Sequence, residues 1–387
     1  MSQTTYIRLF FLFFLTLIYF LININFFDFY VYRLFESCDF QYSPAKLLLQ
    51  KKDVFKIYFS SDLASTVPYR VPGILCSQNP HYAIITNFLM IPFALMEFDL
   101  SKQVYLILNL FLIYLIFDFL LKKKFISKKL LIFCFVFFIL SRPLLTTLII
   151  GQWGIIALYF MCMFFLNSNK IINFISIIIL SLKYTFFPYI FLVLIKLKKY
   201  RQIVLLLFLH ALCIFLYSII TKSILIENIF LPLKIGSVQG FGSINLQDFF
   251  GNHPPMPFNW ILLGIICTIS YLIYIKNTSE DNYHYIIIFT IITIASFRHH
   301  TYDTIFLLPL LIFSLRLNSK LKYFCYLSIF YFWYILDIKY FFDFKFTKIG
   351  IFINFLILII NAFIVFLYFK NNKVSIGKYN FELKRIQ

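Results

Sequence analysis

The sequence predicts an all-α polytopic membrane protein, and three observations support this fold class. Of the 387 residues, 61% are hydrophobic and 13% are charged, which leaves too little polar surface to cover a water-soluble globule. Apolar segments of about 20 residues, the length that crosses a bilayer, recur from residues 6–27 to residues 351–369. Segments such as 171–182 are apolar on every side, whereas β-barrel strands alternate with polar residues. We expect about ten to twelve hydrophobic helices, forming one integral membrane domain over residues 1–387.

Basic residues indicate the orientation of these helices. The net charge is +19, but the lysines and arginines gather in short clusters between apolar segments, at residues 122–129, 196–201, 316–322 and 370–385. Such clusters mark cytoplasmic loops of membrane proteins rather than a nucleic-acid partner. We therefore expect a multi-pass protein of the cell membrane, with the lipid bilayer as a partner. Its first apolar segment is expected to be a retained anchor with the N-terminus in the cytoplasm.

Two polar stretches interrupt the apolar segments. The first covers residues 28–81, directly after the first span, and the second covers residues 221–257. The basic clusters place both on the extracytoplasmic face. In the first stretch, residues 43–49 predict a short interfacial helix with Pro44 in its first turn. The glycines and the Pro254-Pro255 pair of the second stretch favour turns over helix.

Strict alternation of spans fails in two places. Two apolar segments between residues 82 and 121 are separated only by residues 99–102, and two crossings there would put the basic run 122–129 outside. One of these segments is therefore predicted to be re-entrant or interfacial. The short apolar stretch between Arg142-Pro143 and Gly151-Gln152 has the same ambiguity.

Ionisable residues within apolar segments are candidate functional groups because burying them in lipid is costly. Lys183 lies within residues 171–195 and is followed by Pro188, which predicts a helix break just beyond it. At the outer membrane rim Lys183 can bind an anion such as a lipid phosphate, and the alternative is a snorkelling or ion-paired lysine. Asp39 follows the first span closely, and the plain alternative for it is a solvated loop carboxylate.

The cluster Arg298-His299-His300-Thr301-Tyr302-Asp303 interrupts another apolar region. Consecutive side chains point in different directions on a helix, so substrate or phosphate contact is favoured over a metal site. The alternative is a short loop with interfacial charges. The seven cysteines show no metal-ligand spacing. Cys38 and Cys76 share the first polar stretch and either form a disulfide or remain thiols.

Four short motifs, taken in order along the chain, resemble the GT-C superfamily of membrane glycosyltransferases. They are most similar to the bacterial polyprenyl-phosphate-mannose-dependent α-mannosyltransferases. The motifs are Asp39-Phe40-x-Tyr42-x-x-Ala45, Gly151-Gln152-Trp153-Gly154, Leu182-Lys183-x-x-x-x-Pro188 and His300-Thr301-Tyr302-Asp303. The chain departs from the family at Asn79-Pro80-His81-Tyr82, where a Tyr-Pro-Pro type entry is usual, so acceptor contacts there are not carried over.

The resemblance implies transfer of a hexose, by family default mannose, on the extracytoplasmic face. The donor would be a polyprenyl-phosphate-linked sugar, and the acceptor a glycolipid or polysaccharide. Asp39 would act as general base. Donor phosphate or sugar would be contacted by four residues of the other motifs, Lys183, Gln152, His300 and Asp303, and by Arg298, two residues before the last motif. The chemistry implies no cofactor and no metal ligand set, and it is compatible with a divalent cation.

Two other functions stay open at this point. An O-antigen-type polysaccharide polymerase usually has its main outer loop late in the chain, so the early loop 28–81 favours the glycosyltransferase while the loop 221–257 keeps the polymerase open. A lipid-linked sugar flippase or transporter predicts internal repeats, which the sequence does not show. A purely structural scaffold would leave Lys183 without a reason for its cost.

Overall fold

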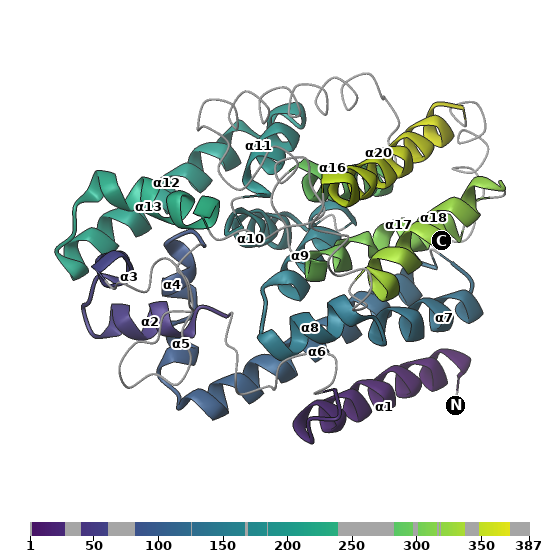
Figure 1. The fold of residues 1–387 in the computed structure, drawn as a ribbon, viewed down its shortest axis with the longest axis horizontal. Coiled ribbons are helices and arrows are strands. Elements are labelled where there is room, and N and C mark those ends of the chain that lie inside the picture. Colours follow the sequence, from purple (N-terminus) through teal and green to yellow (C-terminus); the bar gives the residue numbers. More distant parts are fainter. Residues whose placement is uncertain are drawn as a thin grey trace. The chain divides into compact units, whose positions relative to one another are not determined.

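The computed structural model describes residues 2–27, 40–60, 82–124, 126–166, 169–183, 185–238, 282–296, 301–315, 317, 319–336 and 348–371 (Figure 1). Within these residues the chain is helical and contains no strand. It divides into two compact units. The first comprises Met1–Phe164 with Asn169–Gly240, and the second comprises Phe165–Ser168 with Phe241–Gln387.

Four helical stretches in the described part are long and apolar enough to cross a membrane: α1 (Gln3–Asn23), α6 (Phe98–Lys123), α12 (Tyr200–Thr221) and Ile349–Tyr368 within α20 (Lys348–Asn371). A fifth span results if α7 (Lys128–Ile139) and α8 (Arg142–Ile150) form one broken crossing, bent by 57°. The shorter helices α9 (Gly154–Leu166) and α10 (Lys170–Ser181) are also apolar. The all-helical fold class is thus confirmed, while the total of ten to twelve helices stays a prediction.

Helices α1 and α6 lie antiparallel and are joined by polar contacts near both ends. Arg8 Nε lies 2.6 Å from Asp118 Oδ1, and the Gln103 amide donates to Asn23 Oδ1. Between these contacts, α1 buries one stripe of side chains at helical spacing: Ile7, Phe11, Leu15, Ile18 and Ile22. The start of α1 therefore lies beside the end of α6. Consequently the N-terminus and the basic run 122–129 lie at one end of the α1–α6 pair. The segment that begins at residue 40 lies at the other end of this pair.

The segment preceding α6 does not cross a membrane. It forms two short helices, α4 (Ile85–Leu89) and α5 (Ile91–Ala94), and neither approaches the length of a span. This confirms that one of the two segments expected here is not a crossing. The expected boundary at residues 99–102 is wrong, however, because these residues lie inside α6. Asp99 occupies the first turn of that helix, where a carboxylate favourably meets the positive end of the helix dipole.

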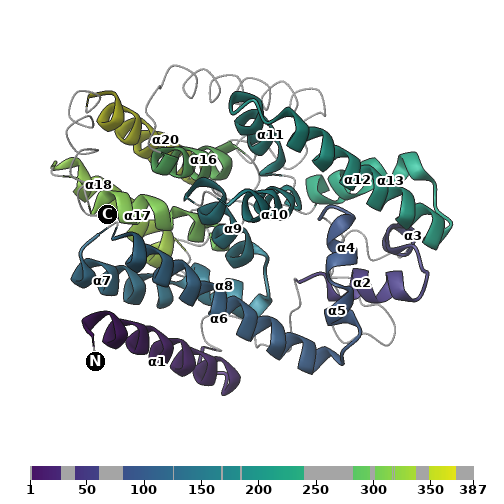
Figure 2. The same ribbon diagram turned by 180° about the vertical axis from the view of Figure 1, so that it is seen from behind.

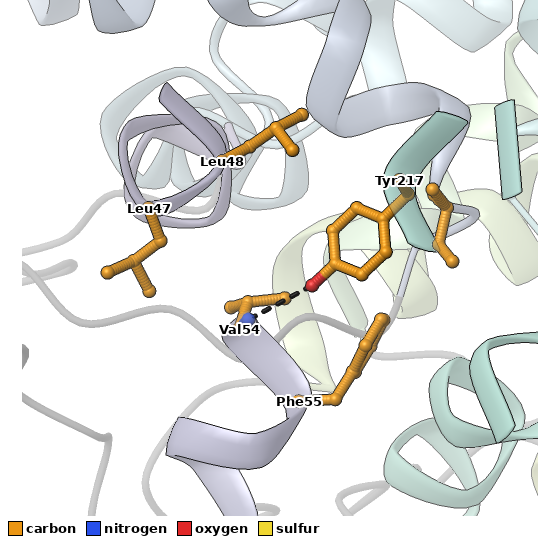
Figure 3. Packing of buried hydrophobic residues seen from close by; sticks show 6 residues of the cluster. Leu47, Leu48, Val54, Phe55 and Tyr217 are labelled. Atoms are coloured by element: carbon orange, nitrogen blue, oxygen red, sulfur yellow. Dashed lines mark hydrogen bonds between the residues drawn. The ribbon is translucent and has the colours of Figure 1, made fainter. Parts of the chain in front are cut away.

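Helices of the first polar stretch pack against the end of α12 (Figure 3). The predicted helix at residues 43–49 is present as α2 (Tyr42–Leu49), and α3 (Val54–Ser60) follows. The Tyr217 hydroxyl accepts a hydrogen bond from the Val54 backbone N–H at 3.0 Å and donates one to Asp53 Oδ1 at 3.1 Å. A buried apolar cluster surrounds this contact: Leu47, Leu48, Val54, Phe55, Ile84 and Tyr217.

This packing fixes the first polar stretch at one end of α12. Tyr217 lies in the last two turns of the helix, whereas the basic run 196–201 lies at its beginning. A helix of 22 residues is about 33 Å long. The basic run 196–201 and the helices α2 and α3 are therefore separated by nearly the length of the span.

The second polar stretch begins as a helix, which corrects the expectation of turns. Helix α13 (Leu225–Val238) runs directly after α12, and both ribbon views show the two side by side (Figures 1 and 2). Its first half is rich in isoleucine, leucine and phenylalanine, and most of the glycines that suggested turns follow it. Helix α13 also contacts α3, so helices of both polar stretches meet at the same end of α12. Residues 239–257 lie outside the described part.

The second unit is built on a pair of packed helices, α16 (Asn282–Ser296) and α20. A short 3₁₀ helix, η3 (Thr301–Leu307), leads into α17 (Leu308–Ser314), and α18 (Leu321–Phe330) continues into a π-helical turn, η4 (Tyr331–Ile335). The Trp333 indole donates to the Thr304 carbonyl at 2.8 Å. The Tyr331 hydroxyl donates to Asn354 Oδ1 at 2.8 Å and so joins η4 to α20.

Candidate functional site

The turn between α8 and α9 places Gln152 inside the first unit. Gly151 ends α8 with φ +77°, a left-handed conformation that glycine adopts without cost. The Gln152 backbone N–H then donates back to the Thr147 carbonyl at 2.9 Å. The Gln152 side chain is almost fully buried and accepts a hydrogen bond from the Tyr82 hydroxyl at 2.8 Å. The local turn thus directs an amide group into the interior, where Tyr82 holds it.

Lys102 lies against the same turn. Its side chain is 1% exposed, and its ammonium group donates to the Ile150 carbonyl at 3.0 Å. The carbonyls at the end of a helix carry a partial negative charge, which stabilises a nearby cation. The Lys102 nitrogen also lies 5.5 Å from the centre of the Phe40 ring, a cation–π distance. A buried cation therefore joins α6, the end of α8 and the first polar stretch.

Gly151 makes this arrangement possible. A β-carbon on Gly151 would lie 3.3 Å from Lys102 Nζ and 3.2 Å from Phe40 Cδ1. Both distances are tighter than ordinary van der Waals contact. The Phe40 ring in turn stacks on Tyr105, with ring centres 4.9 Å apart, and the Tyr105 hydroxyl donates a long hydrogen bond of 3.4 Å to the Gln152 carbonyl.

Lys183 lies in the break between α10 and α11 (Phe187–Lys196). The break covers residues 182–186, and Pro188 falls in the first turn of α11, a position that tolerates proline. The predicted break is thus confirmed. The Ala83 backbone N–H donates to the Leu182 carbonyl at 3.2 Å. Because Ala83 follows Tyr82, this bond connects the Lys183 segment to the Tyr82–Gln152 pair. Lys183 is half-buried, and its ammonium group lies 5.7 Å from the Phe186 ring centre.

Three polar side chains in these segments have a buried donor atom that makes no hydrogen bond to the described residues. The Trp153 indole nitrogen and the hydroxyls of Thr86 and Thr185 are buried and have no hydrogen-bond partner among the described residues. Trp153 lies beside Tyr82, with ring centres 6.4 Å apart, and the two threonines each follow a residue of the Ala83–Leu182 bond by three positions. An unpaired buried polar group costs about 1–3 kcal/mol. A polar ligand that binds these segments has donors available to it.

The start of α2 is held against the entry to α6. The Tyr42 hydroxyl donates to the Met96 carbonyl at 2.9 Å, and the Lys46 ammonium donates to the Ala94 carbonyl at 2.9 Å. Burial, with a smaller contribution from the Glu97 charge, raises the pKa of Tyr42. The phenol therefore stays protonated and keeps its role as a donor. The residue that follows Asp39 in the sequence, Phe40, is fully buried.

The structure brings together parts of three of the four motifs. Phe40 and Gln152 lie in one connected set of contacts within the first unit. The Lys183 segment joins this set through its backbone, because the Leu182 carbonyl accepts a hydrogen bond from Ala83. Asp303 belongs to the second unit, where it is buried at the start of η3. Asp39, Arg298 and His300 lie outside the described residues, as do Cys38 and Cys76. Sequence analysis missed Tyr82, Lys102 and Tyr105. The signal for Lys102 is a lysine one turn into a 26-residue apolar helix. On sequence alone, residues 99–102 are instead assigned to a boundary between two apolar segments.

No group of three histidine, cysteine, aspartate or glutamate side chains that could hold a metal ion is present in the described ranges. Four of the seven cysteines lie in the described residues, and all four are buried free thiols: Cys134, Cys162, Cys213 and Cys325.

The helices and the buried polar junction define the class of this protein, a multi-pass helical membrane protein with a polar site at one end of its first unit. Comparison with known proteins found no matching family model, curated protein or solved structure.

Proposed function

We propose that the protein is a membrane glycosyltransferase of the GT-C kind, which transfers a hexose from a polyprenyl-phosphate-linked donor to a glycolipid or polysaccharide acceptor. The observation that carries this proposal is the junction of Phe40, Gln152 and Lys183. Segments far apart in the sequence, which resemble one family's motifs, meet there around the buried Lys102 ammonium and the buried Gln152 amide. The Lys183 segment joins them through the hydrogen bond between Ala83 and Leu182. A structural scaffold has no need of such a costly polar junction within an apolar helix bundle.

The position of the junction supports a reaction at the extracytoplasmic face. Lys102 lies near the beginning of α6, whereas the basic run 122–129 begins at the other end of that helix. The second basic run, 196–201, likewise lies at the end of α12 remote from α2 and α3. Basic runs face the cytoplasm in membrane proteins. The site then lies at the extracytoplasmic face, where the sugar of a flipped lipid-linked donor is located.

The chemistry follows from the charges available. The acceptor hydroxyl attacks the anomeric carbon, a new carbon–oxygen bond forms, and the bond from that carbon to the lipid phosphate breaks with its electron pair on the phosphate. Asp39 takes the hydroxyl proton, and attack from the opposite side inverts the anomeric centre. Lys183 stabilises the charge on the departing phosphate, and Gln152 and Trp153 offer hydrogen bonds to sugar or phosphate. For Arg298, His300 and Asp303, the proposed donor contact rests on the resemblance alone.

A transfer assay tests this proposal. Membranes containing wild type, Asp39→Asn or Lys183→Ala at matched protein levels are supplied with radiolabelled polyprenyl-phosphate sugars, and incorporation into glycolipid is measured. Asp99→Asn and Lys129→Ala are matched controls, because both side chains are exposed and lie outside the junction. We expect transfer by wild type and both controls, and loss in the two site variants.

Unchanged transfer in Asp39→Asn would exclude this residue as the base. The proposal would also be wrong if wild type transferred sugar from no donor. Elongation of lipid-linked glycan by wild type would then support the polymerase, and its translocation would support the flippase.

A further inference from the structure

Helix α13 exposes several large apolar side chains and buries a polar one. Ile226 and Phe230, one turn apart, are 65% and 62% exposed. Leu225 and Ile229 extend the same surface and are also exposed. Asn228, in contrast, is 1% exposed. A helix that faces water turns its apolar stripe towards the protein interior. The exposed apolar side chains of α13 are therefore not those of a helix in a water-exposed loop.

The buried polar group is bonded to α12. The Asn228 amide nitrogen donates to Ser218 Oγ at 2.8 Å and to Ser223 Oγ at 2.7 Å. Leu231, further along α13, packs against the apolar cluster around Tyr217. Asn228 is thus bonded to the end of α12, Leu231 packs beside that end, and both ribbon views show α13 side by side with α12 (Figures 1 and 2). Small hydroxyl side chains bonded to an amide between helices are typical of helix pairs within a membrane.

The outer face of α13 continues the lipid-facing surface of α12. On α12 the exposed side chains are also large and apolar, among them Phe208, Phe215 and Ile219. Only three residues, Lys222, Ser223 and Ile224, separate the two helices. The carboxylate of Glu227 lies in the first turn of α13, close to this connection, where the end of the span meets water.

We propose that α13 is a re-entrant helix embedded in the membrane leaflet on the side of the polar stretches, with Leu225, Ile226, Ile229 and Phe230 in contact with lipid hydrocarbon. Because α13 contacts α3, it also anchors the first polar stretch at the bilayer surface. This inference is independent of sugar transfer, since it rests on exposure and helix packing alone.

Nitroxide accessibility in reconstituted bilayers tests this placement. Spin labels are attached to Ile226→Cys and Phe230→Cys, in a chain whose reactive native cysteines are replaced by serine. Lys129→Cys, at the exposed start of α7, is the water-facing control. Collision with oxygen, which concentrates in hydrocarbon, is compared with collision with a water-soluble nickel chelate. We expect positions 226 and 230 to collide more with oxygen than with nickel, and position 129 to show the opposite ratio.

Two results would overturn the proposal. A nickel collision rate at positions 226 and 230 equal to that at position 129 would show that α13 faces water. Low collision rates with both reagents would show that another part of the protein, or a second copy, covers this face. Correct folding of each variant is checked by its elution as one species in detergent before reconstitution.

Discussion

The Tyr82 hydroxyl donates a hydrogen bond to the side-chain oxygen of Gln152 at 2.8 Å, and both side chains are buried. Seventy residues separate the two in the sequence. One comes from the approach to α4 and the other from the turn between α8 and α9. Their bond is the central connection of the candidate site, because it links the Gly151–Gln152 turn to the segment that pairs with Leu182.

Removing this bond should weaken both stability and activity. Tyr82→Phe removes this hydrogen bond from the buried Gln152 oxygen, and one such bond contributes about 0.5–1.5 kcal/mol. We expect a lower melting temperature in detergent and reduced sugar transfer. Tyr323→Phe is the matched control, since Tyr323 is 58% exposed. Equal melting curves for Tyr82→Phe and wild type would contradict the bond.

Gly151→Ala should destabilise the site by two routes. The residue has φ +77°, which costs an alanine about 1 kcal/mol. The added carbon would also press on Lys102 and Phe40. We expect a melting temperature below that of wild type. If Gly151→Ala melts like wild type, the tight approach is wrong.

Lys102 should tolerate arginine better than an uncharged chain. Lys102→Met removes the cation at the end of α8, while Lys102→Arg retains the charge beside the Ile150 carbonyl and the Phe40 ring. We expect sugar transfer to fall in Lys102→Met and to be partly restored in Lys102→Arg, measured at equal protein levels. Equal transfer by Lys102→Met and wild type would assign Lys102 a packing role only.

Asp118→Asn should loosen α1 from α6. Asp118 pairs with Arg8 at 2.6 Å and with Lys122 at 2.7 Å, and its own side chain is 8% exposed. Hydrogen bonds to a charged group contribute about 1.5–3 kcal/mol each, although the exposure of both partners reduces this. We expect a lower melting temperature and faster proteolysis near the N-terminus. Asp99→Asn, at an exposed position in the first turn of α6, removes only a favourable helix-dipole contact and should leave proteolysis near the N-terminus unchanged.

Tyr217→Phe should release the start of α3. The hydroxyl holds both the Val54 N–H and the Asp53 carboxylate, and the phenylalanine ring can still fill the apolar cluster. We expect faster hydrogen–deuterium exchange in a peptide covering residues 53–60, with little change elsewhere in the described part. Tyr200→Phe serves as control, because Tyr200 is exposed at the opposite end of the same helix. Unchanged exchange would mean that packing alone holds α3.

Several elements were predictable because their causes are local. A span needs only a run of apolar residues whose backbone bonds are satisfied within the helix, so α1, α6, α12 and α20 follow from composition. Pro44 and Pro188 mark helix starts because proline fixes φ and lacks an N–H. The nature of α13 was not predictable, since glycines and prolines on its C-terminal side suggested turns and its partner residues lie in α12.

Composition and the apolar runs predict the class of the protein, its helical structure and the helix breaks, because each crossing of a lipid bilayer must satisfy its own hydrogen bonds. Which polar residues meet follows from the folded structure alone. Lys102 is a site residue because it is buried against the end of α8, and Tyr82 is one because the Gln152 side chain accepts its hydrogen bond. These pairings depend on the packing of distant helices, and no periodicity or spacing along the chain specifies them.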